Sequence, residues 1–157
     1  MKKLFFLFLF FSALNFNIAK SDEMISIEKY LSDKDPKDYN ATIYSLVRCS
    51  GLERFFATLF FEKDPKSYEQ IKNMSSDFAL AASKYDSLNS KRTFEQSSKN
   101  IINSVGEIYK IYLEDGKKNW SKTGNYYLGS YIDEDRKFCD YTYKKFVMKK
   151  WKQGKFI

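Results

Sequence analysis

Apolar side chains recur every three or four residues along four long segments of this chain, and this spacing constrains the fold more than any other feature. Residues at that spacing share one face of an α-helix, because the helix repeats every 3.6 residues. The clearest set is Ile71, Met74, Phe78, Ala81, Tyr85 and Leu88. No segment alternates apolar and polar residues well enough to predict a strand. The pattern therefore predicts an all-α fold.

Helix-capping residues indicate where the helices begin and end. Residues 34–39 and 63–68 are near copies in which Asp precedes Pro, as at an N-cap and a first helical position. Gly116 is expected to end the third long helix, and Gly124 to interrupt the loop after it. The expected helices span 24–31 (short), 37–62, 65–88, 93–115 and 125–151. Four amphipathic helices joined by short links predict an up-down-up-down four-helix bundle.

The two cysteines lie on the apolar faces of the first and last long helices, at Cys49 and Cys139. Those helices are neighbours in the expected bundle, and a lone cysteine pair in an exported chain favours a disulfide. The bridge would close a loop of 90 positions. By the chain-entropy relation, closing such a loop stabilises the folded state by roughly 4–5 kcal/mol. The alternatives are two unpaired buried thiols and a redox or metal role, which the lack of Cys-x-x-Cys disfavours.

The first residues have the layout of a secretory signal peptide. Lys2 and Lys3 precede an apolar run that reaches Leu14, and Ala19 stands just before a polar stretch. A retained membrane anchor is the alternative, but the run is about half of the ~20 residues that a spanning helix needs. We expect cleavage near Ala19, which would remove residues 1–19. Residues 20–157 would then form a single helical domain, periplasmic or secreted.

The composition removes several kinds of chemistry. The chain has no His, which excludes Ser-His-Asp and Cys-His nucleophiles and His-ligated metals. Carboxylates remain, and they cluster at 133–135 and 114–115. A glycoside hydrolase needs two carboxyls about 5–10 Å apart, one of them with a pKa raised by an apolar pocket. No acid stands alone in an apolar run, so we expect no catalytic residue, metal or cofactor, and rank a carboxylate-dependent hydrolase third.

One pair of opposite charges flanks the cysteines. Arg48 precedes Cys49, and Asp135 lies one helical turn before Cys139. If the cysteines join the first and fourth helices, these charges are expected to pair beside the bridge. Such a pair would be structural rather than catalytic, and worth little if it were solvated.

The C-terminal end, residues 143–157, is basic and aromatic. It contains six lysines and no acid, and apolar residues lie between the lysines. Such a segment can lie on an anionic membrane or envelope polymer, but lysines at a helix end also stabilise the helix without binding anything. The candidate surface-binding residues are Lys144, Lys145, Lys149, Lys150, Trp151, Lys152 and Lys155.

These observations together predict an exported interaction or accessory module that acts without catalysis. An unidentified protein partner is expected. The alternative is peripheral binding to an anionic surface through residues 144–157. Nucleic acid is not an expected partner, because an exported protein meets little of it.

Overall fold

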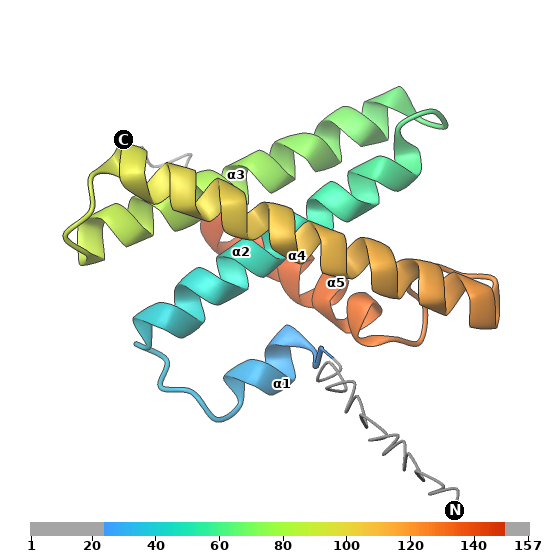
Figure 1. The fold of residues 1–157 in the computed structure, drawn as a ribbon, viewed down its shortest axis with the longest axis horizontal. Coiled ribbons are helices and arrows are strands. Elements are labelled where there is room, and N and C mark those ends of the chain that lie inside the picture. The colour runs from blue at the N-terminus through green and yellow to red at the C-terminus, as the bar shows by residue number, and fades with distance from the viewer. Residues whose placement is uncertain (1–23, 150–157) are drawn as a thin grey trace, which may run out of the picture.

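The computed structural model describes residues 24–149, and the all-α prediction is confirmed for them (Figure 1). This part of the chain forms five α-helices, a short π-helix and no strand. The expected signal peptide and residues 150–157 lie outside the described residues. The elements are α1 (Ile27–Leu31), α2 (Tyr39–Phe60), α3 (Pro65–Asn89), α4 (Phe94–Thr123), α5 (Tyr131–Thr142) and the π-helix η1 (Tyr143–Val147).

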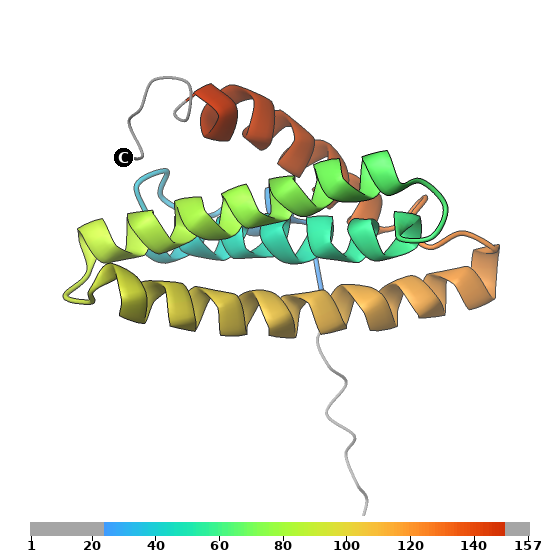
Figure 2. The same ribbon diagram turned by 90° about the horizontal axis from the view of Figure 1, so that it is seen from above.

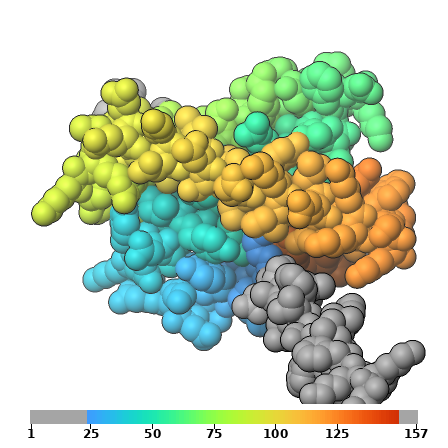
Figure 3. All heavy atoms as spheres, in the orientation of Figure 1, coloured from blue at the N-terminus to red at the C-terminus, as the bar shows by residue number. Residues whose placement is uncertain are grey.

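Helix α2 is the central element. It packs against α1, α3, α4 and α5, whereas η1 packs against α3. Figure 2 shows α2 and α3 side by side in a middle layer, with α4 on one side and α5 on the other. In the space-filling view of Figure 3, α4 lies across the front of the molecule and α3 projects above it. Helices α3, α4 and α5 therefore pack around α2.

Helix α4 passes through Gly116, where the sequence predicted an end. A Cβ at Gly116 would lie 2.8 Å from Cζ of Phe55, so the missing side chain makes room for that buried ring. Helix α4 ends instead at Gly124, which has a φ of 72° and occupies the left-handed region that glycine adopts without strain. The expected bound at residue 115 was wrong because the glycine serves packing there, not capping.

The N-terminal bounds of two other helices also differ from those expected. Asp38, not Asp35, caps α2 by accepting a hydrogen bond from the Ala41 amide, so Pro36 lies in the link before the helix. Helix α5 begins at Tyr131 rather than near residue 125. Ser130 caps this helix. In the turn before it, the side-chain oxygen of Asn125 accepts hydrogen bonds from the backbone amides of Tyr127 and Leu128. By contrast, α3 begins at Pro65 as predicted, with Asp64 as its cap.

The π-helix changes which side chains face the core near the end of the described chain. Val147 is buried, whereas the adjacent Phe146 is 55% exposed. A π-helix contains more residues per turn than an α-helix, so it rotates the face that follows it. The outer end of the stripe on α3 also reaches solvent, since Leu88 is 82% exposed.

Candidate binding groove and the charged core behind it

The predicted disulfide between Cys49 and Cys139 is confirmed. The two Cα atoms lie 5.4 Å apart, and both cysteines are fully buried. The bridge joins the middle of α2 to α5. It therefore links the first and last long helices of the described chain covalently.

The predicted pair between Arg48 and Asp135 is also confirmed, and both side chains are fully buried. Asp135 does more than pair with Arg48 on α2. It accepts a hydrogen bond from the Ile27 amide (N to Oδ1, 2.6 Å) on α1 and another from the Tyr112 hydroxyl (2.5 Å to Oδ2) on α4. One carboxylate on α5 thus contacts α1, α2 and α4, which the sequence did not indicate.

The partners of Arg48 keep it charged in the core. Burial alone would lower the pKa of the guanidinium, but Tyr112 and Asp135 beside it raise that pKa above its usual range. Arg48 also donates a hydrogen bond of 2.8 Å to the carbonyl of Ile25. Burial raises the pKa of Tyr112 strongly, so this hydroxyl keeps the proton that it donates to Asp135.

A second buried acid, Glu53, lies one helical turn after Cys49 on α2. Its Oε2 lies 3.3 Å from Nη1 of Arg136 on α5, and its Oε1 has no hydrogen-bond partner within residues 24–149. Burial raises the pKa of Glu53 to about 7, against the opposing charge of Arg136 and with a smaller contribution from Asp140. The expectation that no acid stands in an apolar run was wrong, because Glu53 is buried among Leu52 and Phe55 on α2.

The two ion pairs between α2 and α5 have opposite polarity. On α2 the cation is Arg48 and the anion is Glu53, whereas on α5 the anion Asp135 directly precedes the cation Arg136. Exchanging the partners would bring like charges together in a buried environment, which is costly. The polarity therefore favours one register of α5 on α2.

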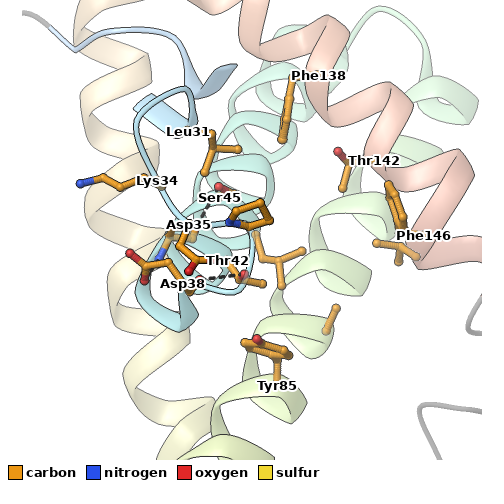
Figure 4. Close-up of a pocket in the computed structure, with 15 residues that line it drawn as sticks. Leu31, Lys34, Asp35, Asp38, Thr42, Ser45, Tyr85, Phe138, Thr142 and Phe146 are labelled. Atoms are coloured by element: carbon orange, nitrogen blue, oxygen red, sulfur yellow. Dashed lines mark hydrogen bonds between the residues drawn. The ribbon is translucent and has the colours of Figure 1, made fainter. Parts of the chain in front are cut away.

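An apolar groove of about 560 Å³ lies between α5 and η1 on one side and α2 and α3 on the other, beside the link that follows α1. Ala41 and Leu46 of α2 and Ala81 of α3 line it with aliphatic side chains. Figure 4 shows Phe138 and Phe146 on its α5 and η1 side. Small residues on two helices facing aromatic residues on the third leave this space open.

The hydroxyl groups in this groove are already hydrogen-bonded to backbone. Ser45 donates to the carbonyl of Ala41 at 2.8 Å, and Thr42 donates to the carbonyl of Asp38 at 3.0 Å. Their remaining exposed surface is largely carbon, so the groove offers apolar contacts. Charged side chains line only its mouth, at Lys34, Asp35 and Asp38.

A second, more polar groove of about 470 Å³ lies between α2, α3 and α4. Its two cations rest over tyrosine rings, with Arg54 4.9 Å from the ring centroid of Tyr109 and Lys72 5.2 Å from that of Tyr68. Lys72 also pairs with Glu69 at 2.7 Å. These contacts already occupy both cations within the protein.

The predicted basic surface is described only in part. Lys144, Lys145 and Lys149 are exposed, and Phe146 between them is also largely exposed. The other candidate residues, Lys150, Trp151, Lys152 and Lys155, lie outside the described residues. The structure thus brings three of the seven candidate residues to one solvent-facing segment.

The acidic clusters singled out by the sequence hold structural contacts. Asp133 pairs with Lys137 at 2.9 Å, and Asp115 accepts a hydrogen bond of 2.8 Å from the Tyr131 hydroxyl. Between residues 24 and 149, no group of three or more potential ligands gathers as a metal ion would require. Nor does that part of the chain contain a helix with the length and apolarity needed to cross a membrane.

Comparison of the chain with protein-family models, curated proteins and solved structures finds no match.

Proposed function

We propose that this protein is an exported, non-catalytic interaction module that holds the apolar part of its ligand in the groove beside α5. The observation that carries this proposal is the groove itself. Its volume of about 560 Å³ falls in the range of about 300–1,000 Å³ typical of ligand sites. Its apolar lining and few charges at the mouth resemble the usual composition of such sites.

The position of the buried acids supports a non-catalytic role. Asp135 and Glu53 are fully buried and each faces an arginine, so neither is open to a substrate in this structure. Neither acid lines the two grooves described above. A carboxylate-dependent hydrolase would need a buried carboxyl at a cavity wall, whereas the two acids at the mouth of the first groove, Asp35 and Asp38, are exposed and half-buried respectively.

The arrangement of helices supports a splayed form of the expected up-down-up-down bundle. Helices α2, α3, α4 and α5 follow one another in alternating directions, and α5 is inclined to the others (Figure 2). We propose that this inclination is what opens the groove, because the end of α5 and η1 lie away from α2. The buried disulfide and the signal-like residues 1–19 support the proposal of export, since structural disulfides persist in oxidising compartments.

A fluorescent apolar dye such as anilinonaphthalene sulfonate tests the groove. Thr42→Leu adds apolar volume to the lining, so the variant should bind the dye several-fold more weakly than the wild type. Thr58→Leu makes the same change on the same helix but in the second groove, and should bind like the wild type. Thermal melts would confirm that both variants fold. Unchanged dye binding by Thr42→Leu would contradict the proposal.

Binding to an anionic surface through residues 144–157 is the second candidate. The exposed Lys144, Lys145 and Lys149, with the exposed ring of Phe146, favour it. We propose that the protein then sediments with phosphatidylglycerol vesicles at low salt and is released as salt rises, because salt screens the attraction. Replacing the three lysines with glutamine should weaken sedimentation, and a variant that sediments like the wild type would dismiss this candidate.

A further inference from the structure

We propose that the occupant of the apolar groove is a single-chain anionic amphiphile, a long-chain fatty acid, whose tail lies in the groove and whose carboxylate meets lysines at the η1 end. This inference rests on the proposed function and specifies the ligand. It depends on three properties of the groove: its size, its lining and the distribution of charge around it.

The size and lining of the groove suit a small apolar molecule better than a second protein. Its volume of about 560 Å³ is usual for a small-molecule site. Fifteen residues line it, whereas a stable protein–protein interface engages about 20–30 residues on each side. The hydroxyls of Thr42 and Ser45 already donate to backbone carbonyls, so they add little polar recognition. A flexible hydrocarbon chain needs only the apolar contacts that remain.

The charge around the groove is unevenly distributed. The link before α2, residues 33–38, carries three aspartates and two lysines, a net charge of −1. On the opposite side, residues 143–149 carry three lysines and no acid, and all three lysines are exposed. None of these three makes an ion pair with another residue between 24 and 149. The groove therefore has a cationic end at η1, where an anionic head group is attracted.

Two of these lysines stand next to residues that line the groove. Thr142 and Phe146 line it (Figure 4), and Lys145 and Lys149 follow them by three residues each. Residues three apart are neighbours on a helix surface, and the flexible four-carbon stem of lysine lets its ammonium group reach beyond its neighbour. Lys145 and Lys149 are therefore the side chains that meet a carboxylate at this end of the groove.

The two acids at the mouth leave this end of the groove cationic. Asp35 and Asp38 belong to the link side, and each uses Oδ1 to accept a local backbone amide, at 2.8 Å from Lys37 and 3.1 Å from Ala41. The two lysines of the same link offset their charges. The chain as a whole carries a net charge of +7, and only two of its lysines lie in residues 1–19, so long-range attraction also favours anions.

Dodecanoate tests the inference, with dodecan-1-ol and dodecyltrimethylammonium as ligands of the same chain length that carry a neutral and a cationic head. Their affinities are measured by displacement of anilinonaphthalene sulfonate from the protein lacking residues 1–19, below the critical micelle concentration of each ligand. We expect dodecanoate to bind at least about threefold more tightly than the alcohol, as two partly exposed ion pairs would allow. The cationic ligand should bind most weakly.

Lys145→Gln with Lys149→Gln should weaken dodecanoate binding roughly three- to tenfold and leave dodecan-1-ol binding unchanged. Lys99→Gln with Lys117→Gln is the matched control, because it removes two exposed lysines from α4, which does not line the groove. In about 0.15 M salt, which screens distant charges, this control should bind dodecanoate as the wild type does. An equal loss in both double variants would overturn the assignment of the carboxylate to η1.

Equal affinity for the three ligands, or tightest binding of the cationic one, would overturn this inference and leave the apolar groove standing if dye binding still responds to Thr42→Leu. A helical peptide of leucine and glutamate that binds more tightly than dodecanoate would also overturn it, because the ligand would then be a protein. Binding to phosphatidylglycerol vesicles without dye displacement by dodecanoate would overturn it in favour of the anionic surface. If no ligand displaces the dye and the dye does not respond to Thr42→Leu, the proposed function fails as well.

Discussion

The buried contact between Arg48 and Asp135 gives the sharpest test of how this fold is stabilised. Removing one member of a buried ion pair leaves an uncompensated charge and costs about 3–5 kcal/mol. Arg48→Met would leave Asp135 with the Ile27 amide and the Tyr112 hydroxyl as its remaining donors. Asp135→Asn would leave Arg48 charged beside neutral groups. Each single variant should therefore lose about 3–5 kcal/mol of unfolding free energy.

The double variant should be far less destabilised than the sum of the two single variants. With both charges gone, no buried charge lacks a partner, and what remains is lost packing and altered hydrogen bonding around Ile27 and Tyr112. We expect its loss to be close to that of one single variant, which corresponds to a coupling energy of at least about 2 kcal/mol.

Urea denaturation followed by far-ultraviolet circular dichroism, with the disulfide intact, measures all four proteins. The slopes of the transitions must agree for the free energies to be compared. Gln96→Ala, which removes an exposed capping contact at the start of α4, serves as a control and should cost about 1 kcal/mol or less. Single variants that each lose under about 1 kcal/mol, or losses that simply add, would refute the reasoning.

Three further predictions follow from the core. The raised pKa of Glu53 means that the folded state binds more protons than the unfolded chain between about pH 4.5 and 7, so the unfolding free energy should fall by a few kcal/mol as pH rises through that window. Denaturation at pH 5, 6, 7 and 8 measures this fall, and Glu53→Gln should flatten it. Replacing Cys49 and Cys139 with alanine opens a loop spanning 90 positions and should cost roughly 4–5 kcal/mol; a loss below about 1 kcal/mol would contradict that value. Gly116→Ala should cost about 1–3 kcal/mol, because its Cβ would lie 2.8 Å from a buried phenylalanine ring. Gly106→Ala, with open space at its Cβ, should instead raise the melting temperature slightly.

The sequence predicted the elements whose signals are local. Periodicity and the Asp64–Pro65 pair located α3 closely, and the apolar stripes placed both cysteines where they could meet. The pairing of Arg48 with Asp135 followed from the same reasoning, because both residues stand beside a bridged cysteine. These features depend on spacing along single helices.

The remaining features depend on contacts between distant segments. Gly116 continues α4 because a ring from α2 occupies the space of its side chain, and no local pattern shows this. The burial of Glu53 depends on α5 covering it, and the groove depends on the inclination of α5 and on the π-helix. One missed feature was readable: Asn125 and Ser130 are both typical turn and cap residues, and together they indicated a later start of α5.

The hydrogen bonds of the Asp135 carboxylate join segments that lie far apart in the sequence. Arg48 precedes this buried partner by 87 residues, and Ile27, whose amide donates to the same carboxylate, precedes it by 108 residues. The three long helices can associate earlier, but until translation reaches α5 a guanidinium faces their half-built interior with no counter-ion. Final packing of this fold therefore requires segments that lie far apart in the described chain, and a chain without α5 would leave Arg48 without its buried carboxylate partner.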